Sequence, residues 1–291
     1  MVISRFAPAP TGFLHLGHVV NAIFVWGVTR AAGGRVLLRI EDHDRRRCRQ
    51  QFERALLDDL EWLGFLPDEP STDAFRDGPC DGRQSDRDET YEAALAVLRS
   101  RGLVYACDCS RSAIASAAGA AGERRYPGTC AARQLSERQG RGLRVRLAPS
   151  IERFEDRRHG ALEQRPSEQC GDLLLRDRDG QWTYQFAVVV DDAAQGVTLV
   201  IRGDDLLEST GRQIQLARLL GRGTPPRYFH HPLIMKTPTQ KLSKADGDTS
   251  VRDLRAAGLS AADVIGRAAA AVGLIAEPRP TWAHEASTLV A

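Results

Sequence analysis

Residues 1–42 read MVISRFAPAPTGFLHLGHVVNAIFVWGVTRAAGGRVLLRIED, and they decide the fold class. Val2–Ala7 is a short apolar run that prolines and a glycine interrupt, and a helical pattern follows from about Gly17 to Ala32. Arg35–Ile40 is a second apolar run with the length of a buried strand. A strand, a helix and a second strand in this order predict an α/β fold with a Rossmann-like, doubly wound parallel sheet covered by helices.

The rest of the chain adds segments of both kinds. We predict helices over about 48–63, 88–101 and 210–220, strand-like segments over 173–176, 183–190, 197–202 and 228–234, and a helical tail after 253. Between about 67 and 172 the periodicity is weak, which favours an insertion over a series of core strands. The predicted division is two halves of the sheet domain (1–72 and 173–244), an inserted subdomain (73–172) and a short helical C-terminal segment (245–291).

The bulk composition is that of an ordinary globular protein. Of the 291 residues, 42% are hydrophobic and 27% are charged. The net charge of +2 gives no overall basic signal, so any contact with nucleic acid must come from a local patch. No apolar run is long enough for a membrane span and the N-terminal segment lacks a signal-peptide pattern, so we expect a cytoplasmic protein.

All lysines of the chain lie in one window, MKTPTQKLSKADGD, at Lys236, Lys241 and Lys244, whereas every other cationic side chain apart from histidine is arginine. An ammonium group is a compact, mobile charge that can follow phosphate oxygens, whereas a guanidinium is a rigid planar fork. The window therefore predicts a phosphate-binding loop. The alternative is a solvated loop in which the lysines cluster by chance.

A pair of histidines, in His15-Leu16-Gly17-His18, stands where the first predicted strand leads into the first helix. A helix N-terminus attracts phosphate, and Gly17 has no side chain to keep a base or phosphate away from the backbone. His15 and His18 could both reach one anion there. Taken alone, the pair is equally compatible with packed or capping imidazoles.

The HLGH and KLSK elements together resemble the two signature motifs of class I aminoacyl-tRNA synthetases. Further stretches resemble glutamyl-tRNA synthetase over about residues 3–258, namely RFAPAPTG (5–12), RIED (39–42), Gln84-Ser85, IRGDDLL (201–207) and STGRQ (209–213). Only residues 245–291 follow Lys244, too few for the anticodon-binding region of that enzyme. The chain thus resembles the short paralogues of the family, the glutamyl-Q tRNA(Asp) synthetases.

The resemblance implies ATP-dependent activation of L-glutamate as glutamyl-adenylate, without tRNA, and transfer to the queuosine base in the anticodon of tRNA(Asp). Mg²⁺ would accompany ATP. The implied catalytic residues are His15, His18, Lys241 and Lys244, and the implied ATP-binding residues are His15, Gly17, His18 and Lys244. The implied glutamate-binding residues are Arg5, Ala7, Ala9, Glu41, Tyr184 and Arg202. We expect a monomer.

Six cysteines do not suggest a disulfide framework in a chain of this size, and only Cys107, Cys109 and Cys130 are close in sequence. Their spacing leaves zinc ligation and buried thiols both open. The resemblance implies one structural Zn²⁺ per chain, held in an acceptor-type insertion by these thiols and Tyr126. A water or another side chain could instead fill the position given to the tyrosine.

Two rival functions stay open at this point: a truncated glutamyl-tRNA synthetase that charges a tRNA 3′ end, and a catalytically silent tRNA-binding paralogue. Two residues depart from the family pattern: His43 stands where threonine usually follows RIED, and Ala245 replaces a serine after KLSK. The arginine runs 45–47 and 157–158 could contact tRNA phosphates, although a solvated face is the simpler interpretation.

Overall fold

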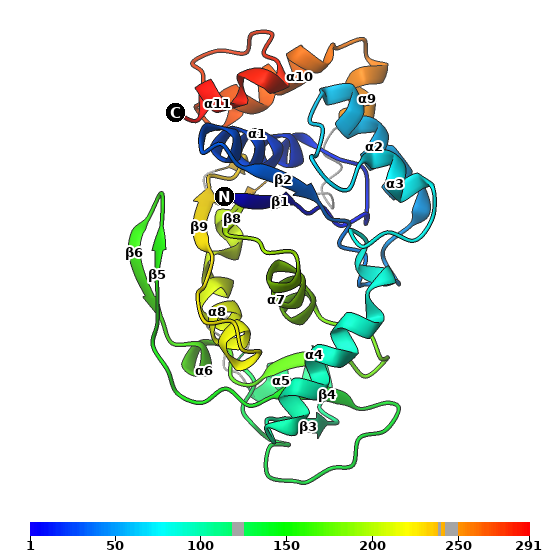
Figure 1. The fold of residues 1–291 in the computed structure, drawn as a ribbon, viewed down its shortest axis with the longest axis vertical. Coiled ribbons are helices and arrows are strands. Elements are labelled where there is room, and N and C mark those ends of the chain that lie inside the picture. Colours follow the sequence, from blue (N-terminus) through cyan, green and yellow to red (C-terminus); the bar gives the residue numbers. More distant parts are fainter. Residues whose placement is uncertain (118–124, 238–239, 242–249) are drawn as a thin grey trace. The chain divides into compact units, whose positions relative to one another are not determined.

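The computed structural model describes residues 1–117, 125–237, 240–241 and 250–291. The chain forms two compact units (Figure 1). The first unit comprises residues 1–86, 197–207 and 226–291, and the second comprises 87–196 and 208–225. Among the residues that the structure describes, no helix is both long and apolar enough to cross a membrane.

A parallel sheet forms the centre of the first unit. Strand β1 (Ile3–Phe6) pairs in parallel with β2 (Arg35–Leu38), and β8 (Leu199–Gly203) pairs in parallel with β9 (Arg227–His231). The Thr198 N–H donates to the Ile3 carbonyl at 2.9 Å, which places β8 beside β1. The strand order is therefore β2, β1, β8, β9. This pairing confirms the predicted α/β fold with a parallel sheet.

Helices cover this sheet. They are α1 (Leu16–Ala31), α2 (Gln50–Leu63), α3 (Thr72–Arg76), α9 (Val251–Ala256), α10 (Ala261–Ala271) and α11 (Ala286–Leu289). Helix α1 is buried on most of its surface because it lies between the strands and the C-terminal helices (Figure 1). A Cβ on Gly27 would lie 2.5 Å from the Ala286 carbonyl oxygen, so α11 approaches α1 at a position that only glycine allows.

Two short strands lie within the lysine-rich window. Strands β10 (Met235–Thr237) and β11 (Gln240–Lys241) pair antiparallel. Residues 242–249, which include Lys244, lie outside the described residues. The Val251 N–H, at the start of α9, donates to the Leu14 carbonyl at 2.8 Å. The described chain that follows the window is thus hydrogen-bonded directly beside His15.

The second unit has an antiparallel sheet of β3 (Val104–Cys107), β4 (Gly142–Val145) and β7 (Leu173–Arg176), and a hairpin of β5 (Glu152–Asp156) and β6 (Gly160–Gln164). Its helices are α4 (Asp88–Ser100), α5 (Arg111–Ala117), α6 (Pro166–Gln169), α7 (Tyr184–Ala194) and α8 (Thr210–Leu219). A buried ion pair joins α4 to α7. The Asp191 carboxylate of α7 accepts from the guanidinium of Arg87, the N-cap residue of α4, at 2.8 Å and from the Tyr91 hydroxyl at 2.9 Å.

One predicted strand is wrong. Residues 183–190 form the start of α7, with Thr183 as its extended N-cap residue. The run Val188–Val190 has the β-branched composition of a strand, but every residue from Phe186 to Asp192 is buried, so no polar face marks the helical period. Burial on all sides outweighs the local propensity of the valines.

The weakly periodic region also contains more strands than its sequence pattern indicated. Strands β3 to β6 have four or five residues each, too few for a clear alternation. The compact units also divide the chain at other positions than 72, 172 and 244. The predicted four-part domain division stays a prediction.

Candidate active site and metal centre

Five of the six predicted glutamate-binding residues gather at the carboxyl ends of strands in the first unit. These positions are Arg5 in β1, Ala7 and Ala9 after it, Glu41 after β2, and Arg202 in β8. The Glu41 N–H donates to the Pro8 carbonyl at 3.0 Å, which brings the two chain segments together. Parallel sheets bind ligands at this edge, so the fold itself assembles these residues. We call them the strand-end site.

The strand-end site holds three buried charges: Arg5 is 4% exposed, Glu41 is 7% exposed and Arg202 is 3% exposed. The Arg5 guanidinium donates to the Ile201 carbonyl at 3.2 Å, and a nitrogen of Arg39 lies 3.4 Å from a Glu41 carboxylate oxygen. Buried charges are costly unless they have partners. Two guanidiniums and one carboxylate at a strand end can bind a zwitterion that carries an additional carboxylate.

The sequence motifs did not identify one residue of this region, His230. His230 is fully buried in β9, and its Nε2 accepts from Arg202 Nε at 2.9 Å. The Tyr228 and His230 rings stack with centroids 6.1 Å apart, so the histidine is fixed from two sides. The signal was the pair His230-His231 inside an otherwise apolar strand, where a buried polar side chain requires a partner.

The histidine turn, residues 15–18, caps α1 through its own side chains. His15 Nδ1 accepts from the Gly17 N–H at 3.1 Å, and His18 Nδ1 accepts from the His15 N–H at 3.1 Å. A neutral imidazole that accepts at Nδ1 carries its proton on Nε2. Both rings, 4.0 Å apart between centroids, can therefore act as Nε2–H donors to an anion at the helix N-terminus.

Gly17 is required by the geometry of this turn. A Cβ at that position would lie 2.9 Å from His15 Cε1 and 3.0 Å from its Nδ1. Real Cβ atoms are almost never this close to another heavy atom, so any larger residue would displace the His15 ring. The sequence suggested that Gly17 gives a ligand access to the backbone, and the structure adds that it gives the His15 ring its place.

The remaining predicted residues are placed less completely. Tyr184 is the first residue of α7 in the second unit and is half-buried. Its part in a glutamate pocket stays a prediction. Lys241 ends β11, and Lys244 lies outside the described residues. His43, the departure from the family pattern, places Nδ1 2.7 Å from the Gln84 side-chain oxygen.

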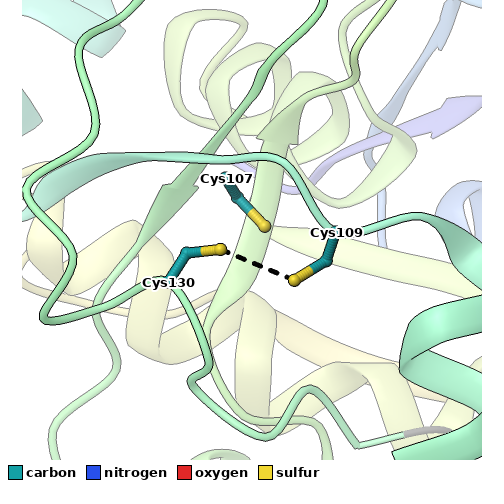
Figure 2. Close-up of side chains that lie close together, drawn as sticks. All are labelled: Cys107, Cys109 and Cys130. Atoms are coloured by element: carbon teal, nitrogen blue, oxygen red, sulfur yellow. Dashed lines mark hydrogen bonds between the residues drawn. The ribbon is translucent and has the colours of Figure 1, made fainter.

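The second unit contains a cysteine cluster, which we define as Cys107, Cys109 and Cys130 (Figure 2). Their Sγ atoms all lie within 4.8 Å of one another, and the pair Cys109–Cys130 is 3.5 Å apart. The Tyr126 hydroxyl lies 3.5 Å from Cys107 Sγ and accepts from the Cys130 N–H at 2.9 Å. The structure thus brings together all four predicted ligands.

The dimensions fit a tetrahedral metal. Zinc–sulfur bonds of about 2.3 Å at tetrahedral angles separate sulfurs by about 3.8 Å, and a sulfur and an oxygen by about 3.5 Å. The cluster could therefore hold a metal ion, with three thiolates and one phenolic oxygen as donors. Three soft sulfur donors favour zinc over magnesium or calcium.

The electrostatics of the cluster are uneven. Burial raises the pKa of Cys107, but hydrogen bonds from Tyr126 and Arg144 more than offset it, so the pKa is lowered. The Arg144 Nε lies 3.4 Å from Cys107 Sγ, and its guanidinium carbon stacks 3.7 Å from the centre of the Tyr126 ring. Burial, followed by hydrogen bonding with Cys130, raises the pKa of Cys109 to about 11. A cation would be needed to hold all three thiols as thiolates.

Residues 1–264 match the family of tRNA synthetases class I (E and Q), catalytic domain. A glutamyl-Q tRNA(Asp) synthetase of Symbiobacterium thermophilum is 42% identical, over 98% of this chain and 91% of its own length. The chain belongs to the glutamyl-Q tRNA(Asp) synthetase family. A second member, from Rhodobacter capsulatus, is 43% identical over 90% of this chain and 98% of its own length. The resemblance seen in the sequence motifs is confirmed.

A solved structure agrees with this assignment at the level of fold. The crystal structure of a glutamate tRNA ligase from Elizabethkingia meningosepticum, in complex with its amino acid, superposes with a TM-score of 0.78 at 24% identity. The match covers 98% of this chain and 64% of that one, so this chain spans just under two thirds of that ligase. As a member of the glutamyl-Q tRNA(Asp) synthetase family, the protein has the catalytic domain of a ligase-type enzyme.

Proposed function

We propose that this protein activates L-glutamate with ATP, in the absence of tRNA, and transfers the glutamyl group to the queuosine base in the anticodon of tRNA(Asp). The observation that carries the proposal is the combination, in one chain, of the histidine turn, the strand-end site and the length of a relative named for this activity. The histidine turn caps α1 directly after β1, and the same strand ends in the strand-end site, in a chain that matches 91% of the length of a relative named for this activity.

In the first step, an oxygen of the glutamate α-carboxylate attacks the α-phosphorus of ATP, and the bond to the pyrophosphate oxygen breaks. His15 and His18 supply Nε2–H donors to the phosphate oxygens at the N-terminus of α1. Lys244, supported by Lys241, follows the charge that develops on the departing pyrophosphate, and Mg²⁺ arrives with ATP. Positioning and charge stabilisation suffice for this reaction.

Selection of glutamate requires partners for one ammonium group and two carboxylates. In this proposal Glu41 pairs with the α-ammonium, and Arg202, which His230 holds through its Nε, binds a carboxylate through its guanidinium fork. Arg5 and Tyr184 complete the polar contacts. Ala7 and Ala9 leave room for the side chain, because larger residues would occupy the pocket.

In the second step, a hydroxyl of the queuosine ring attacks the activated carbonyl carbon and loses its proton as the ester bond forms. The bond between that carbon and the phosphate oxygen breaks, and AMP leaves with its electron pair. The zinc in our proposal is structural and takes no part in either step. It is held by Cys107, Cys109, Tyr126 and Cys130, and it folds a region with few apolar side chains of its own. We also expect a cytoplasmic monomer.

Glutamate-dependent exchange of pyrophosphate into ATP, measured without tRNA, tests the first step. Transfer of labelled glutamate is then compared on tRNA(Asp) with queuosine, tRNA(Asp) without it, and unmodified tRNA(Glu). We expect exchange without tRNA and transfer to the first substrate alone. Transfer to tRNA(Glu) would establish a truncated glutamyl-tRNA synthetase instead, and absence of exchange would establish a silent paralogue.

The lysine window offers its own test. Lys244→Arg keeps the charge but replaces a mobile ammonium with a rigid fork, so we expect the exchange rate to fall by about 100-fold, as when one stabilising donor is removed. Lys236→Arg is the matched control in the same window and should retain the wild-type rate. Equal rates in both variants would refute the role of Lys244.

A further inference from the structure

A cavity of about 740 Å³ lies within the first unit, beside the strand-end site. Its walls come from the first nine residues of α2, the segment before α2, the end of α3, and residues 78–86. Pro10 and Asp42 line it, and these residues directly follow Ala9 and Glu41 in the sequence. The cavity therefore opens next to the residues that we assign to glutamate binding.

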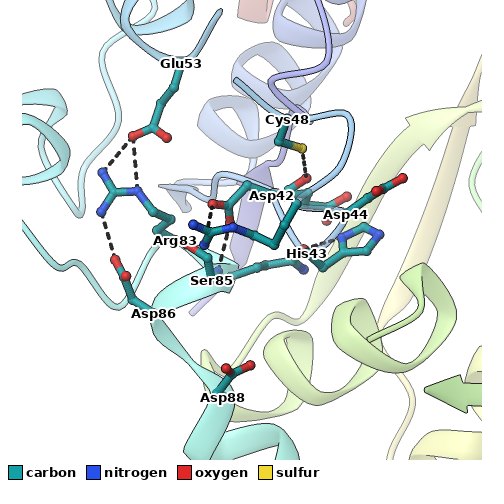
Figure 3. A network of polar contacts seen from close by, with 12 residues as sticks. Asp42, His43, Asp44, Cys48, Glu53, Arg83, Ser85, Asp86 and Asp88 are labelled. Carbon is teal, nitrogen blue, oxygen red and sulfur yellow. Dashed lines mark hydrogen bonds and ion pairs between the residues drawn. The ribbon is translucent and has the colours of Figure 1, made fainter. Parts of the chain in front are cut away.

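The acidic side chains of the cavity already have cationic or amide partners (Figure 3). Arg83 lies between Glu53, at 2.6 Å, and Asp86, at 2.8 Å. Asp42 accepts from the Ser85 N–H at 2.8 Å. Arg76 forms an equivalent pair with Asp58 at 2.7 Å. Glu53, Asp86 and Asp58 are thus neutralised by arginines, and the remaining carboxylate, Asp42, is only 6% exposed.

Three exposed arginines of the same cavity have no carboxylate oxygen within hydrogen-bonding distance among the described residues, and we call them the arginine face: Arg45, Arg49 and Arg54. Arg45 comes no closer than 3.7 Å to a carboxylate oxygen of Asp42. Arg49 donates only to backbone carbonyls of its own turn. Arg54 has no hydrogen bond or ion pair to any residue that the structure describes. The arginine face is a set of guanidiniums whose donors are available to an external anion.

The surroundings add to the positive potential. Arg49 is the N-cap residue of α2, and its side chain makes no cap hydrogen bond. The acidic side chain of the first turn, Glu53, is paired with Arg83 at 2.6 Å, so it offsets the positive end of the helix dipole only in part. Arg49 and Arg54 are separated by about 7.5 Å along the helix axis at 1.5 Å per residue. This separation suits successive phosphates of a chain better than one small ion.

We propose that the arginine face binds backbone phosphates of the tRNA substrate and so holds the anticodon loop with its acceptor base at the strand-end site. This inference rests on the proposed function. Arginine forks match phosphate oxygens in a bidentate manner. Among the described residues that line the cavity, Phe75 is the only aromatic one. It is 4% exposed and has the guanidinium of Arg83 over its ring at 5.5 Å, so it offers no open face on which a nucleotide base could stack.

The test compares two triple variants. In the first, Arg45, Arg49 and Arg54 are replaced by Gln. In the second, the same change is made at Arg227, Arg267 and Arg279, which are exposed positions of the same unit outside the cavity. Binding of tRNA(Asp) is measured by fluorescence anisotropy over a series of salt concentrations. Pyrophosphate exchange without tRNA is measured on the same preparations.

For single strands, each phosphate contact contributes a salt slope of about 0.7, which is about fivefold in affinity at about 0.1 M salt. The cavity variant should therefore lose about 100-fold in affinity, and its slope should fall by about 2. Its KM for ATP in exchange should not change. The control variant should match the wild type in both measurements.

An unchanged affinity and slope in the cavity variant would overturn the proposal, as would an equal loss in the control. A higher KM for ATP would assign these arginines to nucleotide phosphate rather than to RNA. If the triple variant failed to fold, the single variants Arg49→Gln and Arg54→Gln would decide, each with a slope change of about 0.7. Failure of the wild type to transfer glutamate would refute the proposed function, whereas the binding data would still decide the role of the arginine face.

Discussion

The strand-end site of the first unit and the cysteine cluster of the second are held in place by different means. The strand-end site lies at the edge of a parallel sheet above a large apolar core, in which Phe6, Ile23 and Leu38 are fully buried. The cysteine cluster packs with only a few apolar neighbours, and two of its own thiols are part of its small core. A fold can hold the first site without a ligand, whereas the second has too little buried apolar surface to do so.

Burial acts differently on the ionisable groups of the two sites: charged side chains are kept in the strand-end site, and a thiol is kept protonated in the cysteine cluster. In the strand-end site, buried charges already have protein partners, such as Arg202 with His230. In the cysteine cluster, burial raises the pKa of Cys109 to about 11, so the thiol stays protonated until a cation displaces the proton. In our proposal, the first site is formed before its substrate binds, and the second becomes stable when a metal binds.

The largest expected effect is loss of the metal centre. Cys130→Ser removes one of the three sulfur donors, and we expect the second unit to lose more than about 4 kcal/mol of its free energy of unfolding together with its zinc. Urea unfolding and metal analysis by mass spectrometry measure both quantities. Cys170→Ser is the control, because that thiol lies outside the cluster and donates to the Pro166 carbonyl, a bond that a hydroxyl can also make. Equal zinc content in the Cys130 variant would contradict the assignment.

The next largest effect is expected in the first unit, where a substitution should impair exchange and leave the cysteine cluster unchanged. Gly17→Ala places a Cβ within 2.9 Å of the His15 ring, so the ring must move and the exchange rate should fall by about 100-fold. The zinc content and the stability of the second unit should not change. Gly223→Ala, at a glycine with no heavy atom within 4 Å of the added Cβ, should behave as the wild type. A Gly17 variant with normal exchange would show that the histidine turn has no catalytic part.

A smaller effect is expected at the fourth ligand. Tyr126→Phe removes a phenolic donor and leaves the buried Cys130 N–H without its acceptor at 2.9 Å, so zinc affinity should fall by about 10- to 100-fold. Competition with a chromogenic chelator measures this affinity. Tyr105→Phe serves as the control, since it also loses a buried hydroxyl bond, to Asp172 at 2.6 Å, but no ligand. If both variants bound zinc equally, a water would have to complete the coordination instead.

The smallest effect concerns a buried carboxylate in the first unit. Burial raises the pKa of Asp59 from 3.8 to about 6. The folded state therefore binds this proton more tightly than the unfolded state, and stability falls as the pH rises through that window. Asp59→Asn should stabilise the protein by about 1–2 kcal/mol at pH 7, after screening, and by almost nothing near pH 4.

Urea unfolding at the two pH values checks this expectation. Asp58→Asn is the matched control, because that neighbouring carboxylate is largely exposed and paired with Arg76. It should not gain stability at pH 7. A stability gain of equal size at both pH values in the Asp59 variant would show that the charge is not its cause.

Much of the fold follows from local pattern. The limits of α1, α2, α4 and α8 were predicted to within about two residues, because each carries an apolar face or a clear start signal. Residues 183–190 were assigned wrongly because a helix buried on all sides has no polar face to reveal its period. His230 was missed because its partner, Arg202, lies in a different strand.

The sequence by itself determined the family, the motifs and the types of residue that a site would need, because these depend on short, contiguous stretches such as HLGH and RIED. Tertiary structure alone decided that Nδ1 of each turn histidine accepts a backbone N–H, because that depends on how the turn brings the rings to the backbone. It also decided that three thiols and a phenol meet within bonding range of one ion. Distances between residues far apart in the chain are set by tertiary packing, and short sequence patterns do not predict that packing.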